Sequence, residues 1–406
     1  MSDSGGNTKL RILLINTGIF PVPPNRGGGI EMHTYNLARA LSELGSEVHY
    51  VTDITDEARF SASVTVCRTH TPRMRFQAGF NEWVMSHVIG GVFSFKTALS
   101  ALLRKHSNFD IVHVHGNLSG LLVSMVNEPT PLVFTIHNPT PWMCTYESTY
   151  EQKFREAVYR LIDANTIRRA DHIIAVNERL KDEIVAKWST PRSKVTVVPN
   201  GVDTHAFHQG RRKTADLRAK YGIEGMYCLF VGQLRSRKGV DSLLKAFSEI
   251  DDSSIKCVVV GDGPEWGRLQ KLVDDLKLRR RVLFTRSVPF EDLTNLYAGA
   301  EFFVLPTVAE GSPLVVLEAL ASGLPVVSTT VSGIPEIVKN EQNGFTVPPR
   351  DVHALAESMR LLIEDAELRA KMSENARRNT IESFSWNAVA KKTLSVYRKA
   401  IEDKSR

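Results

Sequence analysis

The chain has 406 residues, of which 42% are hydrophobic and 24% are charged. This length is enough for about two globular domains, and the composition excludes a disordered chain or a collagen-like fibre. The net charge of +6 favours anionic partners such as phosphates, nucleic acid or an anionic membrane face, without choosing among them. The four cysteines are far apart, so reduced thiols are expected rather than a zinc knuckle or a redox pair.

The N-terminal residues, MSDSGGNTK, lack the basic and apolar regions of a signal peptide. No run approaches the roughly 18 apolar residues that a membrane-spanning helix needs. We therefore expect a cytoplasmic protein. Residues 73–106 interleave Arg and Lys with Phe, Trp, Met and Val, which leaves two interpretations open: a surface helix that touches an anionic membrane, or an ordinary amphipathic helix over the first sheet.

Short runs rich in Val, Ile and Leu alternate with longer helical patterns, as in repeated βα units. The runs of the first half are LRILLINT, EVHYVTD, SVTVCRTH, DIVHVHG, PLVFTIH, HIIAVN and VTVVPN. The runs of the second half are YCLFVGQL, KCVVVGDG, RVLFTRSV, EFFVLPT and LPVVSTTV. Continuous apolar runs are typical of parallel strands buried on both faces. The sequence therefore predicts an α/β fold with two doubly wound parallel sheets, joined near residues 199–222, where turn residues and charges replace the apolar pattern.

A run of three glycines, Gly27 to Gly29, opens the first long helical pattern. Glycines at the start of a helix let backbone N–H groups approach a phosphate or a sugar, because no Cβ intervenes. Ten residues separate Gly28 from Thr17 at the end of the strand, so this is not the dinucleotide fingerprint, whose glycines follow the strand at once. A simple flexible turn is the alternative interpretation.

A basic loop follows the first strand of the second half. The segment VGQLRSRKG places Arg235, Arg237 and Lys238 between that strand and the next helix. A lysine at the carboxyl end of a strand, beside a helix N-terminus, is well placed to bind a diphosphate. A solvated basic loop is the alternative, and the next motif favours the diphosphate.

The segment EGSPLVVLE, residues 310–318, holds two glutamates after the strand at 301–305. We expect a helix with Ser312 as its N-cap and Pro313 at its first position, where the missing N–H is not needed. Glu310 would then lie on the loop before the helix and Glu318 inside it.

The first N–H groups of this helix would lie between the two carboxylates. Leu314, Val315 and Val316 would offer them to a diphosphate. The two glutamates would then bind neutral hydroxyls on either side. Two sugars that flank a diphosphate describe a nucleotide-sugar, so the pattern predicts a nucleotide-sugar site.

With these residues the sequence resembles the retaining glycosyltransferases of family 4, which have the GT-B fold of two Rossmann-like domains facing across a cleft. EGSPLVVLE resembles their E-x7-E motif, VGQLRSRKG their glycine, basic-loop and Lys-Gly segment, and PNGVD their interdomain signature. The resemblance covers nearly the whole chain. It implies an acceptor-side domain at residues 1–200, joined by a C-terminal helix at 385–406, and a nucleotide-sugar-binding domain at 201–384.

The resemblance also implies roles for individual residues. Glu310 would contact the donor sugar close to the reacting carbon, and Glu318 would bind the ribose hydroxyls. Lys238 would hold the departing diphosphate, whose negative charge it stabilises in the transition state. In the first domain, His137 would face the donor sugar across the cleft. The glycine pair Gly28 and Gly29 would let the N-terminal loop approach the sugar phosphate and the acceptor.

Two positions depart from the family pattern. Gln233 stands where the family often has an arginine, so a second phosphate cation would have to come from Arg235 or Arg237, or be absent. Ser312 and Pro313 stand where the family often has other residues within E-x-F-G, and Pro313 lacks an N–H that glycine would offer. Neither change removes a carboxylate or the lysine, so we expect an active enzyme.

The sequence predicts no metal and no cofactor. It contains no D-x-D triplet, the carboxylate pair that holds Mg²⁺ or Mn²⁺ against a diphosphate in metal-dependent transferases. His113, His115 and His137 could be imagined as a zinc triad. No spacing motif supports such a triad, and histidines that pack at strand ends are the favoured interpretation.

These observations predict a retaining hexosyltransferase that uses a UDP- or GDP-sugar and a glycan or lipid-linked hydroxyl acceptor, with no role for nucleic acid. The preferred mechanism is a same-face attack in which the leaving phosphate oxygen takes the acceptor proton, and a covalent route through another carboxylate stays open. The alternatives are a nucleotide-sugar epimerase or phosphorylase of the same fold, and a non-catalytic module that binds nucleotide-sugars.

Overall fold

The structure is a computed structural model of the chain. It describes residues 9–16, 29–52, 64–68, 108–116, 129–137, 150–211, 217, 220–223 and 225–405. Gly27, Gly28 and the basic and aromatic segment 73–106 lie outside the described residues, so the predictions made on them stay predictions. No helix in the part of the chain that is described is long and apolar enough to cross a membrane.

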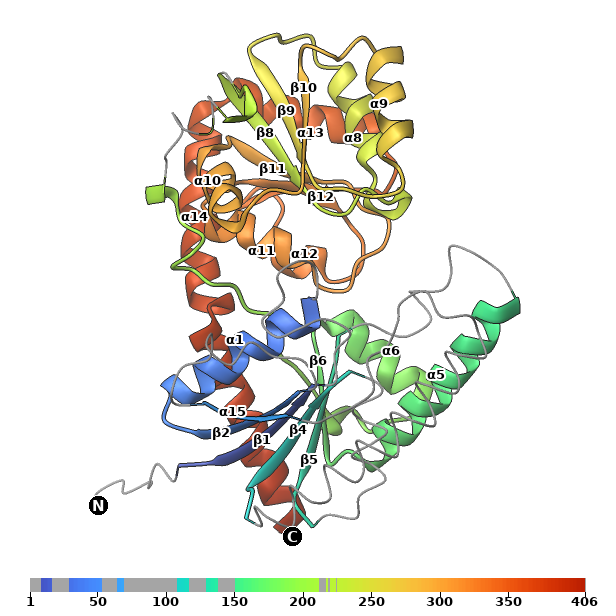
Figure 1. The fold of residues 1–406 in the computed structure, drawn as a ribbon, viewed down its shortest axis with the longest axis vertical. Helices are drawn as coiled ribbons and strands as arrows, with labels where there is room; N and C mark the ends of the chain where they lie inside the picture. Colours follow the sequence, from blue (N-terminus) through green and yellow to red (C-terminus); the bar gives the residue numbers. More distant parts are fainter. Residues whose placement is uncertain are drawn as a thin grey trace. The chain divides into compact units, whose positions relative to one another are not determined.

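The chain divides into two compact units (Figure 1). Unit 1 consists of residues 1–199 and 389–406, and unit 2 of residues 200–388. Each unit is built on a parallel sheet, so the predicted α/β class with two doubly wound parallel sheets is confirmed. The acceptor-side and nucleotide-sugar-binding roles of the two parts stay predictions.

Unit 1 holds a seven-stranded parallel sheet in the order β3-β2-β1-β4-β5-β6-β7. Its strands are β1 (Arg11–Asn16), β2 (Glu47–Thr52), β3 (Val64–Arg68), β4 (Ile111–His115), β5 (Leu132–Ile136), β6 (His172–Ala175) and β7 (Val195–Val197). Its described helices are α1 (Gly29–Glu43), α5 (Tyr150–Arg169), α6 (Glu178–Trp188), the 3₁₀ turn η4 (Arg192–Lys194) and most of α15 (Trp386–Ser405). The order reverses between β1 and β4, and ligands of such sheets bind beyond the carboxyl ends of the strands at this point.

The C-terminal helix α15 packs within unit 1. The Tyr397 hydroxyl forms a 2.6 Å hydrogen bond with Nδ1 of His113 on β4. Nζ of Lys399 donates to the carbonyl of Ser193, and Nζ of Lys404 lies 2.9 Å from the carboxylate of Asp171. The last residues of the chain therefore complete the N-terminal unit.

Unit 2 holds a six-stranded parallel sheet in the order β10-β9-β8-β11-β12-β13. Its strands are β8 (Met226–Val231), β9 (Ile255–Val260), β10 (Val282–Arg286), β11 (Phe302–Leu305), β12 (Val326–Thr329) and β13 (Gly344–Val347). Its described helices are α8 (Val240–Ser248), α9 (Trp266–Asp275), α10 (Phe290–Gly299), α11 (Leu314–Ala321), α12 (Ile334–Ile337), α13 (Val352–Glu364) and α14 (Ala366–Phe384), with the 3₁₀ turns η5 (Gln209–Arg211) and η6 (Ser236–Lys238).

The core of unit 2 explains why its central strands are so apolar. Helices cover both sides of the sheet (Figure 1), and β8, β11 and β12 are buried along almost their whole length. Phe230, Phe302 and Phe303 are fully buried in that core. Here the sheet order reverses between β8 and β11, which places the ends of these two strands at the edge where ligands bind.

Candidate functional site

The sequence-predicted donor residues of unit 2 gather beyond the two central strands. β8 leads into η6, which ends at Lys238, and β11 leads into the loop that carries Glu310. Because β8 and β11 are neighbouring parallel strands, their carboxyl ends deliver these two loops to the same edge. Residues that lie 72 positions apart in the sequence are thereby brought together.

Lys238 and Glu310 form a buried ion pair at this edge. Nζ of Lys238 donates to Oε1 of Glu310, and Nη1 of Arg237 lies 3.2 Å from the same oxygen. Each member of the Lys238–Glu310 pair is only 9% exposed. Two cations thus surround one carboxylate, and the cluster keeps a surplus positive charge that suits a phosphate.

The two loops of the cluster are tied to each other by their backbones. The hydroxyl of Thr307 donates to the carbonyl of Arg237 at 2.9 Å, and the N–H of Val308 donates to the same carbonyl at 2.8 Å. Gly239 has a φ of +70°, and a Cβ on it would lie 2.0 Å from the carbonyl oxygen of Pro306. Only glycine fits there without displacing the loop that leads to the carboxylate.

Glu318 lies within α11, in contact with α10 of the same unit. The hydroxyl of Tyr297 donates to Oε2 of Glu318 at 3.0 Å. Burial raises the pKa of Glu318 to about 7, although the Tyr297 hydrogen bond acts in the opposite direction. Burial also raises the pKa of Tyr297 well above its usual range, so this phenol stays a donor. The carboxyl group is therefore held near its ionisation point at neutral pH.

The raised pKa of Glu318 predicts how the stability of the protein depends on pH. The folded pKa of Glu318 lies above the unfolded one, so its favourable contribution is complete below about pH 4.5 and is lost as pH rises through about 7. Glu318→Gln keeps the hydrogen bond but cannot ionise. We expect the unfolding free energy of the variant to exceed that of the wild type by about 1–3 kcal/mol at pH 8 and to equal it near pH 4. This range is smaller than the pKa shift alone would give, because the Glu318 side chain is partly exposed. Denaturant unfolding at pH 8 and pH 4 measures this difference, and Glu382→Gln, a change at an exposed glutamate, is the control. The same pH dependence of the unfolding free energy in the wild type and in Glu318→Gln would contradict the prediction.

Helix α11 begins one residue later than the sequence analysis predicted. Pro313, with φ −72° and ψ 113°, is the N-cap, and Leu314 is the first helical residue. The chain is still extended at Pro313, so Ser312 precedes the cap and its hydroxyl makes no capping bond. The side-chain amide of Asn200 instead donates to the carbonyl of Ser312 at 2.9 Å, which holds the loop before the helix.

The later start of α11 also changes which N–H groups are free to bind an anion. The N–H of Val316 donates to the carbonyl of Pro313 at 3.1 Å, so it is not available as predicted. The N–H groups of Leu314 and Val315 occupy the first two helical positions, which have no acceptor within the helix. These two remain the donors that α11 can offer to an anion.

Arg235 does not join the ion cluster. It is exposed, and its Nε donates to Oε1 of Gln233 at 3.3 Å. Of the two arginines proposed to replace the missing family cation, the structure therefore brings Arg237 to Glu310 and leaves Arg235 at the surface.

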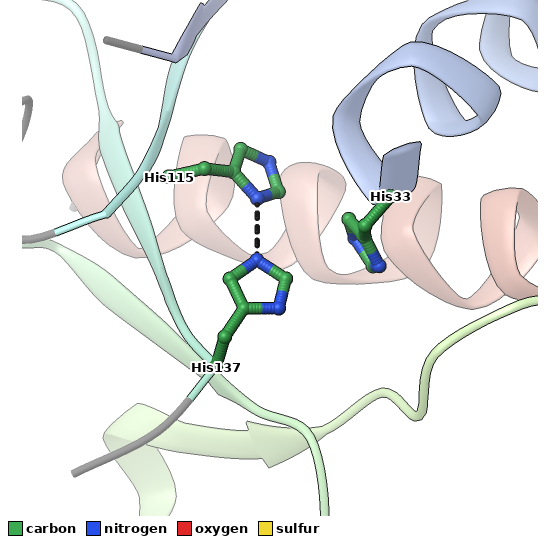
Figure 2. A group of neighbouring side chains, drawn as sticks. All are labelled: His33, His115 and His137. Atoms are coloured by element: carbon green, nitrogen blue, oxygen red, sulfur yellow. Dashed lines mark hydrogen bonds between the residues drawn. The ribbon is translucent and has the colours of Figure 1, made fainter. Parts of the chain in front are cut away.

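In unit 1, four histidines lie at or near the carboxyl ends of β4 and β5. Both ring nitrogens of His113 are occupied, one by Tyr397 and the other by the hydroxyl of Thr135 at 2.7 Å. A 3.0 Å hydrogen bond joins His115 to His137 (Figure 2). Burial, reinforced by the neighbouring imidazoles, holds the pKa of His115 and His137 well below the usual range, so both rings are neutral at pH 7.

The group of histidines that could share an ion differs from the triad weighed in the sequence analysis. His33, from the first turns of α1, takes the place of His113: one ligand atom each from His33, His115 and His137 lies within 4.8 Å of the others. Gly29, four residues before His33, is the first residue of α1.

Two family models match the chain. The model of the group 1 glycosyl transferases matches residues 214–379, and that of glycosyltransferase family 4 matches residues 27–206. The chain belongs to these glycosyltransferases. The glycosyltransferase family predicted from its motifs is thereby confirmed, and with it the prediction that the protein is a transferase enzyme.

Relatives of this glycosyltransferase match over nearly its whole length. A glycosyltransferase of Methanocaldococcus jannaschii, described as uncharacterized, is 28% identical over 387 residues, 94% of this chain and 96% of that protein. The D-inositol 3-phosphate glycosyltransferase of Corynebacterium glutamicum is 26% identical over 98% of both chains.

Solved structures support the GT-B fold. The sucrose-phosphate synthase of Thermosynechococcus elongatus aligns with a TM-score of 0.78 at 23% identity, over 97% of this chain and 100% of that one. The Anabaena protein HepE in complex with UDP aligns with a TM-score of 0.74 at 17% identity, over 96% of this chain and 100% of that one. The predicted fold of the glycosyltransferase is therefore confirmed.

Sequence reasoning missed several residues that shape the sites of this glycosyltransferase. Thr307 and Tyr297 are ordinary members of a loop and a helix pattern, and only their buried hydroxyls reveal their part. His33 follows the glycine run by four residues, which places it in the early turns of the helix, and that spacing is the one signal that could have drawn attention to it.

Proposed function

We propose that this glycosyltransferase moves a hexosyl unit from a nucleoside diphosphate sugar, a UDP- or GDP-sugar, to a hydroxyl group of a glycan or lipid-linked acceptor, with retention of configuration. The observation that carries the proposal is the cluster of Arg237, Lys238 and Glu310 at the strand-order reversal of unit 2. The structural neighbour HepE, which is known in complex with UDP and with UDP-glucose, supports a donor of this class.

The arrangement of the cluster supports separate roles for its residues in binding the donor. The contacts that the described residues make with the Glu310 side chain use Oε1. Oε2 would then accept a hydrogen bond from a hydroxyl of the donor sugar. Lys238 and Arg237 would contact the diphosphate, which the N–H groups of Leu314 and Val315 would also approach.

Glu318 would accept hydrogen bonds from the ribose hydroxyls. A carboxylate accepts two such bonds, whereas a protonated carboxyl group offers weaker acceptors, so donor affinity should rise as Glu318 ionises near its raised pKa of about 7. The proposed contact of His137 with the donor sugar rests on the family resemblance alone. The same holds for the approach of Gly28 and Gly29 to the acceptor.

We further propose that the leaving diphosphate is neutralised without Mg²⁺ or Mn²⁺, by Lys238, Arg237 and the N-terminus of α11. Initial rates with saturating donor are expected to be unchanged when either ion is added or left out of the assay. A rate that depends on added Mg²⁺ or Mn²⁺ would contradict this part of the proposal, because it would require an ion at the diphosphate.

The experiment that tests the proposed activity is a donor panel. The protein is incubated with UDP-, GDP- and ADP-sugars, and released nucleotide is measured with and without acceptor extracts. We expect at least one donor to release nucleotide at a rate that the acceptor raises. Conversion of the donor sugar without nucleotide release would favour the epimerase, dependence on inorganic phosphate the phosphorylase, and tight binding without turnover the non-catalytic module.

We also propose that the protein works in the cytoplasm and touches an anionic membrane face through residues 73–106. The basic and aromatic composition of this segment supports the contact. The protein is expected to sediment with liposomes that contain anionic lipid at low salt, and to be released at high salt. Liposomes of neutral lipid are the control. Protein that stays in the supernatant with both kinds of liposome would contradict the membrane contact and favour the alternative, an ordinary amphipathic helix.

A further inference from the structure

Three histidines from separate parts of unit 1 meet at one edge of its sheet. His33 comes from α1, His115 is the last residue of β4, and His137 directly follows β5. Their exposed fractions are 3%, 0% and 8%. One possible ligand atom from each ring lies within 4.8 Å of the other two, and Figure 2 shows the His33 ring beside the hydrogen-bonded pair.

The contacts of His115 point to a ligand within this group. Its Nδ1 shares a 3.0 Å hydrogen bond with Nε2 of His137. Its Nε2 is buried and has no hydrogen-bond partner among the described residues. A buried polar atom of this kind normally has a partner in a native protein. A ligand that binds the imidazole nitrogen of His115 would therefore complete the site.

His113 shows by contrast what a satisfied histidine looks like on the same strand. Its two ring nitrogens are bonded to Tyr397 and Thr135, and its ring lies 4.2 Å from that of His115, centroid to centroid. His113 therefore packs against the ring of His115 and has no nitrogen left for an ion. This separates the three-histidine cluster, His33, His115 and His137, from the fourth ring.

We propose that the three-histidine cluster binds one divalent transition-metal ion, of which Zn²⁺ is the best match. Neutral imidazole nitrogens suit Zn²⁺ and its neighbours in the first row, whereas Mg²⁺ and Ca²⁺ prefer oxygen ligands. A tetrahedral ion with bonds of about 2.0–2.1 Å places its ligand nitrogens about 3.3 Å apart. One nitrogen from each of the three rings already lies within 4.8 Å of the other two, so small ring rotations would bring the three ligands to that spacing.

The three-histidine cluster lies at the edge of the sheet where a substrate would bind. His115 ends β4, one of the two strands between which the order of the unit 1 sheet reverses. Ligands of doubly wound sheets bind at this edge. Three protein nitrogens leave the fourth position of a tetrahedral ion for an oxygen ligand, either water or a hydroxyl of a bound substrate. The ion is a prediction about unit 1, and His137 is the one residue that it shares with the donor contacts proposed above.

Metal content tests the proposal directly. The full chain, freed of any histidine tag, is dialysed against a chelator, loaded with Zn²⁺, desalted and measured by plasma mass spectrometry. About one Zn²⁺ per chain is expected. Competition with a chromophoric chelator should then show that His33→Ala and His115→Ala each weaken Zn²⁺ affinity by at least about 100-fold, since loss of a direct ligand exceeds the loss known for supporting residues.

His172→Gln is the matched control. His172 is a buried histidine of the same sheet, on β6, whose Nε2 shares a 2.8 Å hydrogen bond with Thr196 outside the cluster. This variant is expected to keep wild-type affinity. Circular dichroism establishes that each variant is folded, and His33→Gln, which removes the imidazole with less loss of volume, replaces any alanine variant that is not.

The outcomes separate cleanly. One ion per chain that is lost with His33 or His115 and kept with His172→Gln supports the proposal. A Co²⁺-loaded protein with the visible spectrum of a tetrahedral nitrogen site, absent from the His33 variant, supports it further. A wild type that retains no ion after desalting overturns it, as does equal ion content in the wild type and the cluster variants, which would indicate adventitious binding. Because none of these readouts uses glycosyl transfer, failure of the donor proposal leaves this test intact.

Discussion

Replacing Lys238 with methionine is expected to lower kcat by on the order of 100-fold, the scale seen when an enzyme loses one group that stabilises developing negative charge. Methionine fills much of the same space without the ammonium group, so the departing diphosphate loses its buried cation. The rate of nucleotide release at saturating donor measures the effect. Lys245→Met, an exposed lysine on the helix that follows, is the control and should keep the wild-type rate.

The ion pair raises the question whether Lys238 acts on substrate or only holds Glu310. The double variant Lys238→Met with Glu310→Gln removes both charges, so no carboxylate is left without its partner. If Lys238 and Glu310 both act on the donor, the double variant is at least as slow as either single variant. Recovery toward the wild-type rate in the double variant would contradict the assignment, because it would show that the lysine merely compensates the carboxylate.

Gly239→Ala is expected to destabilise unit 2 by about 2–4 kcal/mol. A non-glycine residue at its φ of +70° is strained, and the added Cβ would overlap the carbonyl oxygen of Pro306, so the loop to Lys238 must shift. Chemical denaturation followed by intrinsic fluorescence measures the loss of unfolding free energy. The surviving folded protein should also turn over slowly, because this loop positions the cation.

Gly267→Ala provides the matched comparison. Gly267 lies in α9 without a positive φ, and a Cβ there would meet nothing within 4 Å. Alanine favours a helix over glycine by up to about 1 kcal/mol, so this variant should be as stable as the wild type or slightly more so. Equal stability changes at the two glycines would show that neither the positive φ of Gly239 nor the nearby Pro306 carbonyl excludes a side chain there.

The strands were predictable because each is an almost unbroken apolar run. LRILLIN and FFVL, for example, read as buried parallel strands, and they form β1 and β11 at the centres of their sheets. The start of α11 was predicted one residue early, because proline and serine favour both the cap and the first turn, and sequence alone did not reveal that Asn200 holds the Ser312 carbonyl.

Contacts between side chains that are distant in the sequence were harder to predict than the strands. The sequence pointed to Lys238 and Glu310 as two parts of one site, but not to their direct ion pair, which follows from the adjacency of β8 and β11. The partners of Glu318 and of the unit 1 histidines come from elements distant in sequence, Tyr297 in one case and His33 in the other. Local patterns carry no record of such contacts.

The affinity of the protein for a nucleoside diphosphate, compared with the matching monophosphate, tests whether Lys238 binds the diphosphate. Titration calorimetry with UDP and UMP, and with the guanosine and adenosine pairs, measures it for the wild type and for Lys238→Met. The preferred diphosphate should bind at least about tenfold more tightly than its monophosphate, a difference of about 1.4 kcal/mol, and most of this difference should vanish in the variant. Equal affinity for diphosphate and monophosphate, or a preference that survives the loss of Lys238, would contradict the site.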